Sequence, residues 1–154
     1  MTSSFELTAR FVTFEEMLSC DGYIVYTNVG TSMLPLLRER RDIVEIRPKP
    51  VSRCRKYDVV LYRRGKQYIL HRVLKVLPEG YVIAGDHNTF LERDVTDAMI
   101  LGVLTRVIRD GKSIGVNDWR YRLYVLIWCA PWPLRMLLLR LAAMLRSVCR
   151  RLKR

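Results

Sequence analysis

The sequence lacks the features that define several common classes of protein. Its four cysteines are far apart, so no zinc knuckle or redox pair is indicated, and nothing demands an oxidising compartment. No apolar run follows a basic start at the N-terminus, because Glu6 and Arg10 interrupt it, and no signal peptide is expected. The uncharged run Leu123–Leu134 in the C-terminal part contains two prolines and is shorter than the ~20 residues of a spanning helix.

Acidic residues are absent from the C-terminal part of the chain. The 154 residues carry a formal charge of +12, and nine of the 27 Lys and Arg residues follow Trp119, where no Asp or Glu occurs. The first 118 residues hold the other 18 basic residues and all 15 acidic ones. The excess charge is therefore a property of the tail, and it indicates an anionic partner.

The remaining pattern predicts a mainly β domain of ordinary size, since half the residues are hydrophobic. Thr13 and Glu16 form a capping box for a short helix that ends near Asp21-Gly22. Short strand-like runs separated by turn signals follow, which favours a folded, barrel-like sheet. The expected strands are 23–29, 42–47, 58–62, 68–76, 81–84 and 100–108.

The tail is predicted to be a basic amphipathic helix with two tryptophans, Trp128 and Trp132, at its start. This pattern is typical of a helix that lies in a membrane interface. A helix packed on the β domain with a solvated basic face is the alternative, and a nucleic-acid arm is the weakest reading. We expect a domain at 1–118, a tail at 119–154, and peripheral attachment of residues 120–154 to an anionic membrane on its cytoplasmic face.

Ser32 lies between a flexible glycine and the apolar, proline-stiffened stretch Met33–Leu37. It is either an ordinary turn residue or a nucleophile, and a nucleophilic serine needs a base nearby. The chain has only two histidines, His71 in a strand-like run and His87 in a turn. Taken alone, a histidine on a strand is more often structural, and a serine after glycine is more often a turn residue.

Taken in order, the motifs resemble those of type I signal peptidases and the wider superfamily that includes the LexA-type self-cleaving domains. Ser32-Met33-Leu34-Pro35 resembles the Ser-Met-x-Pro nucleophile box, and Tyr57-Asp58-Val59-Val60 resembles the Gly-Asp-[IV]-V strand. His71-Arg72-Val73 resembles the His-Arg-[IV] of the endoplasmic-reticulum branch, where bacterial enzymes have Lys-Arg-Val. Gly85-Asp86-His87-Asn88 resembles the Gly-Asp-Asn-Asn box, and Ile100–Val103 a later family strand.

The resemblance implies a serine endopeptidase with Ser32 as nucleophile and His71 as general base. Lys75 is the rival base. Asp86 is the first candidate to orient His71, with Glu92 and Asp94 as further candidates for the third member. The paired aspartates of the family are not present as such.

The resemblance also implies an oxyanion hole and a peptide groove. Gly30 stands where bacterial enzymes often have a serine, so the Ser32 backbone N–H and the Thr31 hydroxyl remain as donors. Met33 and Pro35 are expected in the groove wall, beside a strand edge that pairs with an extended peptide. A leader, signal or precursor peptide is the expected substrate, with no metal or cofactor. A non-catalytic peptide-binding or regulatory module on the same fold is the alternative.

Overall fold

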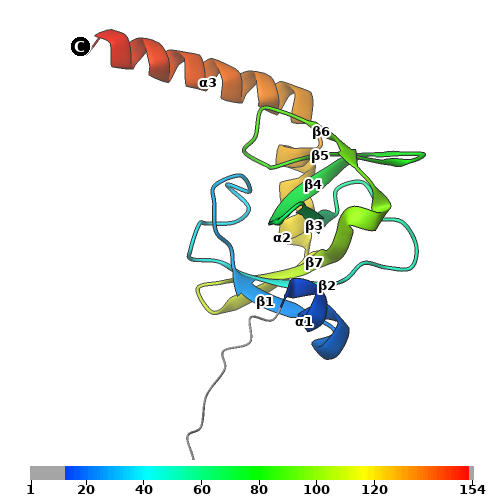
Figure 1. The fold of residues 1–154 in the computed structure, drawn as a ribbon. Coiled ribbons are helices and arrows are strands. Elements are labelled where there is room, and N and C mark those ends of the chain that lie inside the picture. The colour runs from blue at the N-terminus through cyan, green and yellow to red at the C-terminus, as the bar shows by residue number, and fades with distance from the viewer. Residues whose placement is uncertain (1–12, 153–154) are drawn as a thin grey trace, which may run out of the picture.

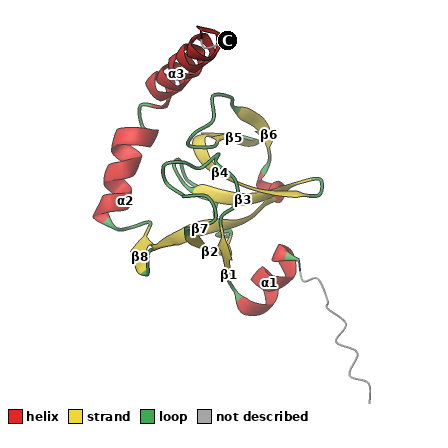
Figure 2. Ribbon diagram, turned by 90° about the vertical axis from the view of Figure 1, so that its left-hand side faces the viewer, coloured by secondary structure: helices red, strands yellow, loops and turns green. Residues whose placement is uncertain are grey.

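The structure, a computed structural model, describes the backbone of residues 13–152 and the side chains to residue 145, except residue 143. One sheet forms the centre of the structure (Figures 1 and 2). A short helix precedes its strands in the chain, and further helices follow them. The strands are β1 (Ile24–Thr27), β2 (Ile43–Pro48), β3 (Val59–Arg64), β4 (Gln67–Leu77), β5 (Gly80–Ala84), β6 (Glu92–Val95), β7 (Ile100–Arg109) and β8 (Lys112–Gly115). The helices are α1 (Phe14–Asp21), the 3₁₀ turn η1 (Asp97–Met99), α2 (Trp119–Tyr124), the π-helical turn η2 (Val125–Cys129) and α3 (Trp132–Leu152).

The eight strands form an open antiparallel sheet in the order β1-β2-β7-β3-β4-β5-β6, with β8 paired to β7. The prediction of a mainly β fold is confirmed, and all six expected strands are present with ends shifted by a few residues. The short strands β6 and β8 were not expected. Because β1 and β6 lie at the two ends of this order, the sheet is not closed into a complete barrel.

The sheet curls strongly between β3 and β6. Two strands separate them in the sheet order, yet the Tyr62 hydroxyl on β3 lies 2.7 Å from a carboxylate oxygen of Glu92 on β6. Arg64 on β3 also pairs with Glu92 at 2.7 Å. One buried cluster fills the inside of the curl, and it comprises Cys54, Val60, Tyr62, Val73, Tyr81, Ile83, Val95 and Ile100. The curl brings polar side chains from distant strands into one buried place.

The expected capping box at the start of α1 is confirmed. The Thr13 side chain accepts from the Glu16 backbone N–H, and the Glu16 carboxylate accepts from the Thr13 N–H. The left-handed Gly22 ends the helix. Phe14 at the start of α1 lies against the rings of Tyr26 and Tyr68, with centroids 5.2 and 4.8 Å away. This contact fixes α1 beside β1 and β4.

The C-terminal segment begins inside the folded domain and not as a separate tail. Tyr121, Cys129, Arg135 and Met136 are buried, so the boundary expected at residue 118 separates residues that pack together. Beyond its first turns α3 projects from the sheet (Figure 1). Among the described residues no single helix is long and apolar enough to cross a bilayer. Trp119–Cys129 and Trp132–Ala142 reach that criterion only as a pair bent by 66°.

Candidate active site

Ser32 lies in the turn that connects β1 to β2. Gly30 has a φ of 99°, a backbone conformation that glycine adopts without the steric cost of a Cβ. The base of the turn is held by the buried carboxylate of Asp42, which accepts hydrogen bonds from Arg38 and Arg109. Burial raises the pKa of Asp42, but these hydrogen bonds and the Arg109 charge outweigh it and lower the pKa to about 2. The base of the Ser32 turn is therefore held by an ionised carboxylate whose hydrogen bonds are made to Arg38 and Arg109.

The loop Gly85–Asn88 holds Ser32 against the sheet. The backbone N–H of His87 donates to the Ser32 carbonyl oxygen at 2.8 Å. A Cβ at Gly85 would lie 2.6 Å from the same oxygen, a distance that only glycine allows. Ala84 directly precedes this loop and pairs with Arg72, the neighbour of His71. These contacts bring Ser32 to the end of β5, beside the part of β4 that carries His71.

His71 is buried on β4 and hydrogen-bonded to Glu92. Its Nδ1 lies 2.7 Å from Oε1 of Glu92, while the other carboxylate oxygen accepts from the Tyr62 hydroxyl. Arg64 also neutralises Glu92, at 2.7 Å. Burial lowers the pKa of His71 below 6.5, and the attraction of Glu92 opposes this shift without cancelling it. At neutral pH His71 is thus the neutral imidazole that a general base requires, with Nδ1–H directed at a carboxylate.

Asp86 forms no hydrogen bond with His71 in the described structure, and it acts on the expected base only through its charge, which raises the pKa of His71. Its carboxylate forms a bidentate ion pair with Arg72, with distances of 2.8 and 2.7 Å. Both side chains are fully buried. Because Arg72 and His71 are adjacent on a strand, their side chains point to opposite faces of the sheet. Asp86 therefore belongs to the opposite face, and Glu92 occupies the position beside the histidine.

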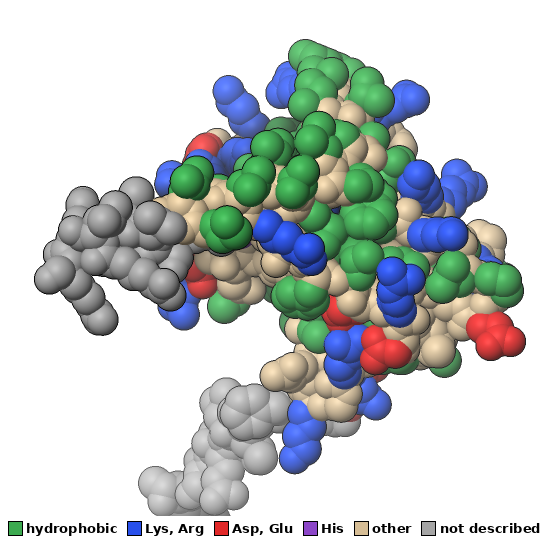
Figure 3. All heavy atoms as spheres, turned by 90° about the horizontal axis from the view of Figure 1, so that it is seen from above, with side chains coloured by type: hydrophobic (Ala, Val, Ile, Leu, Met, Phe, Trp, Pro, Cys, Tyr) green, Lys and Arg blue, Asp and Glu red, His purple; other side chains and the backbone are tan. Residues whose placement is uncertain are grey.

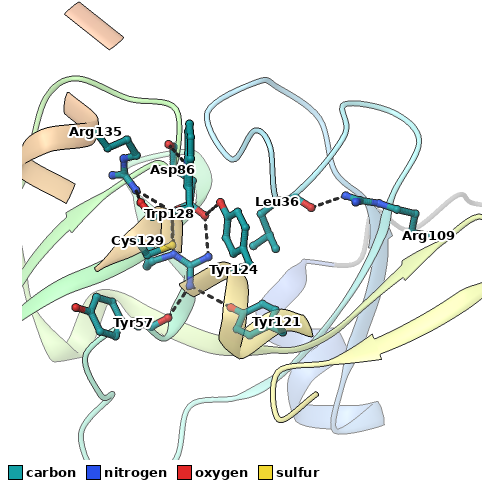
Figure 4. A network of polar contacts seen from close by, with 10 residues as sticks. Leu36, Tyr57, Asp86, Arg109, Tyr121, Tyr124, Trp128, Cys129 and Arg135 are labelled. Carbon is teal, nitrogen blue, oxygen red and sulfur yellow. Dashed lines mark hydrogen bonds and ion pairs between the residues drawn. The ribbon is translucent and has the colours of Figure 1, made fainter. Parts of the chain in front are cut away.

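The C-terminal segment completes the surroundings of Asp86 (Figure 4). The Tyr124 hydroxyl donates to the Asp86 carboxylate at 2.8 Å, and Trp128 Nε1 donates to the Asp86 backbone oxygen at 3.1 Å. Arg72 also reaches the Tyr121 hydroxyl at 3.1 Å. The turn that carries Ser32 is thus linked through the 85–88 loop to α2 and η2.

Beside Ser32 lies a cavity of about 310 Å³. Its lining is contributed by α1, β1 and β4 together with the serine, and it includes Phe14, Tyr26, Thr27, Asn28, Val29, Tyr68, Ile69 and Leu70. Within the described part of the chain, the Ser32 hydroxyl forms no hydrogen bond, either with His71 or with another group. Catalytic hydrogen bonds often tighten only in the substrate complex, so the absence of this bond does not by itself exclude a nucleophile–base pair.

Several other expected site residues lie elsewhere. Met33 is 1% exposed and belongs to the core, and Pro35 lines a different cavity, formed with Arg109, Tyr121 and Tyr124. Neither residue lines the cavity beside Ser32. Lys75 is exposed and pairs in the sheet with Val82.

The two remaining candidates of the sequence analysis lie at the surface. Asp94 is 75% exposed and binds Arg64. Thr31 is exposed next to Ser32, and in the described structure the backbone N–H groups of both residues are without a hydrogen-bond partner. The Ser32 N–H therefore remains a candidate oxyanion donor, and the Thr31 N–H is a second one that the sequence analysis did not name.

Sequence reasoning missed the parts of the site that depend on long-range contacts. Tyr62 sits in a β-branched and aromatic run that marks only a buried strand, and Tyr124 and Trp128 belong to a stretch that resembles an interfacial helix. No local signal connects any of them to the site. None of the protein families, curated proteins or solved structures compared with this chain matches it.

Proposed function

We propose that this protein is a serine endopeptidase of the signal-peptidase type, with a signal-peptidase/LexA-like sheet. The observation that carries the proposal is the buried His71, which is held by Glu92 at 2.7 Å and kept neutral by burial. A histidine retained only for packing has no need of a carboxyl partner that is itself held by an arginine and a tyrosine.

In the proposed reaction His71 removes the proton from the Ser32 hydroxyl as its oxygen attacks the scissile carbonyl carbon. The backbone N–H groups of Thr31 and Ser32 bind the developing oxyanion. The imidazolium, stabilised by Glu92, then protonates the leaving amine as the C–N bond breaks. Water, activated by His71 in the same way, releases the acyl group from Ser32.

The substrate in this proposal is an extended peptide that pairs with β1. Among the described residues this strand lies at the edge of the sheet and pairs with β2 alone, so its outer backbone groups are candidates for pairing with another strand. Residues 26–29, in β1 and just after it, line the cavity beside Ser32. A peptide added to β1 would therefore place one of its side chains in that cavity.

The decisive experiment is labelling with a serine-reactive fluorophosphonate. We expect the wild type to be labelled and both Ser32→Ala and His71→Ala to lose the label. Ser19→Ala is the matched control, because the Ser19 hydroxyl is exposed and bonds only locally, and it should be labelled like the wild type. Equal labelling of the wild type and Ser32→Ala would exclude Ser32 as the nucleophile. The alternative, a non-catalytic peptide-binding or regulatory module on the same fold, would then be favoured.

The second part of the proposal is peripheral attachment of the enzyme to an anionic membrane, on its cytoplasmic face, through α3. The projecting part of α3 exposes large apolar side chains, each 44–66% accessible: Leu134, Leu137, Leu138, Leu141, Met144 and Leu145. Figure 3, which looks down on this side, shows hydrophobic side chains gathered in a band with Lys and Arg side chains around it. This combination is typical of a helix that lies in a lipid interface.

Vesicle sedimentation tests the membrane part. Leu138→Glu combined with Leu141→Glu should abolish binding to vesicles that contain phosphatidylglycerol, because both exposed side chains become charged. Val51→Glu with Val76→Glu is the matched control, since these exposed residues lie on other elements. Equal loss of binding in both pairs, or no loss in either, would contradict docking through α3.

A further inference from the structure

A second cavity, of about 660 Å³, lies between the sheet and the α2–η2 segment. It shares no lining residue with the cavity beside Ser32. Its inner wall includes Val59, Leu104 and Val116, and its outer wall is formed by residues of α2 and η2. Cavities of this size and apolar character commonly hold small-molecule ligands.

Tyr57 lines this cavity in a backbone conformation that is unfavourable for tyrosine. Its φ is 75°, in the left-handed region, which costs a non-glycine residue of order 1–3 kcal/mol. The conformation is fixed from both sides, because its N–H donates to the Val73 oxygen at 2.7 Å and its oxygen accepts from Arg72 at 2.8 Å. A glycine would satisfy the same backbone without strain. Strained residues that persist in a fold are pointers to function, and Tyr57 is one of the residues that line the cavity.

The outer wall is apolar and open to solvent. Trp119, Leu123 and Leu126 all line the cavity, yet they are 67%, 45% and 66% exposed. Val125 and Leu126 of this wall belong to the π-helical turn Val125–Cys129, and such turns, which are rare overall, occur frequently at functional sites. The wall offers hydrocarbon surface and few hydrogen-bonding groups, so a bound peptide backbone would lose its hydrogen bonds to water without replacement.

Two cations lie at the rim without an acidic partner. Lys56 and Arg122 are both exposed, and in the described structure neither forms an ion pair. Lys56 Nζ lies over the Tyr57 ring, 4.8 Å from its centroid. Asp58 is the acidic residue of the lining, and its carboxylate accepts the Arg55 N–H at 2.7 Å. The rim therefore favours an anion beside an apolar chamber.

We propose that this cavity binds one acyl chain with an anionic head group, the chain between the sheet and η2 and the head between Lys56 and Arg122. Charge complementarity at the rim and the scarcity of polar groups in the wall together select an anionic amphiphile. The inference goes beyond the peptidase function and uses neither Ser32 nor His71.

Calorimetric titration of the full chain with decyl phosphate, below its critical micelle concentration, tests the proposal. We expect one site that binds decyl phosphate at least about tenfold more tightly than decanol, a difference in binding free energy of about 1.4 kcal/mol. The double variant Lys56→Gln, Arg122→Gln should bind decyl phosphate about tenfold or more weakly than the wild type and bind decanol with unchanged affinity. Lys66→Gln with Arg93→Gln, the matched control, removes two exposed charges elsewhere and should bind like the wild type.

Other outcomes would overturn the proposal. Equal affinity for decanol and decyl phosphate, or equal weakening by both double variants, would mean non-specific adsorption. Absence of binding would reject the site directly. Ser32→Ala should bind decyl phosphate normally, and a loss there would place the ligand in the peptidase site.

Tyr57→Gly separates a ligand role from a structural one. Because the substitution relieves left-handed strain, the thermal midpoint should not fall, while decyl phosphate binding should weaken by about tenfold. A lower midpoint with unchanged affinity would show that the ring serves stability alone and would remove Tyr57 from the site. The Lys56 and Arg122 variants test the rim independently of that result.

Discussion

Replacement of Asp86 by asparagine tests the assignment of this residue to the fold and not to catalysis. Arg72 and Asp86 are both 0% exposed at their side chains, and their ion pair is bidentate. Removal of one partner of such a pair leaves an uncompensated buried charge, which costs about 3–5 kcal/mol. Arg135 lies 3.9 Å from the same carboxylate and would add to the unbalanced positive charge. Because a domain of this size has only about 5–15 kcal/mol of total stability, Asp86→Asn should approach the limit of folding.

The assay is urea denaturation, with the free energy of unfolding taken by linear extrapolation. Asp94→Asn is the matched control, because Asp94 is 75% exposed and pairs with Arg64 at the surface. The control should change the free energy of unfolding by no more than about 1 kcal/mol. If Asp86→Asn proves as stable as Asp94→Asn but loses all peptidase activity, the reasoning is refuted and Asp86 belongs to the catalytic groups.

Three further predictions follow from the site. In a pH–rate profile the wild-type rate should rise with pH to a half-maximum below pH 6.5 and be level at pH 7, because burial lowers the pKa of His71 and only its neutral form accepts a proton. Glu92→Gln should reduce kcat/KM by about 10²–10⁴-fold and move this rise to still lower pH. A rise that moves to higher pH in the variant would contradict the assignment. The pKa of Asp42 is lowered to about 2, so this residue contributes stability that is present above about pH 4 and lost as the pH falls toward 2. In an acid titration followed by circular dichroism, Asp42→Asn should lose stability less steeply with falling pH than the wild type, because it has already lost that contribution at pH 7. Gly85→Ala should reduce labelling of Ser32, because the added Cβ lies 2.6 Å from the Ser32 oxygen; normal labelling would show that this close approach is unimportant.

The sequence predicted most strands because their apolar residues are continuous in the chain. β3 and β4 are buried runs bounded by turn signals, and such runs indicate strands without reference to the rest of the fold. β6 escaped prediction because it reads Glu-Arg-Asp-Val, a composition that is atypical of strands. It becomes a strand through its pairing with β5, which no local pattern reveals.

The partners of the two buried carboxylates were equally inaccessible to the sequence. The family motifs made both Asp86 and Glu92 candidates for the carboxylate partner of His71. Which of the two reaches His71 depends on the curl of the sheet. It brings Glu92 to His71 and leaves Asp86 with Arg72 on the other face. Amphipathic periodicity predicted the exposed leucines of α3, but a helical wheel contains no information about which polar groups Tyr124 and Trp128 bind.

The attachment of Tyr124 and Trp128 to Asp86 has a consequence for the order in which the protein is made. A ribosome releases the chain from its N-terminus, so Ser32, His71 and Glu92 leave the ribosome well before residues 121–128. Until that segment arrives, the buried Arg72–Asp86 pair lacks the hydroxyl and indole groups that surround it, and the loop that holds Ser32 has no support from α2 and η2. Under the proposed peptidase function, we therefore expect the nascent chain to cleave no peptide until residues 121–128 have left the ribosome and folded onto the sheet.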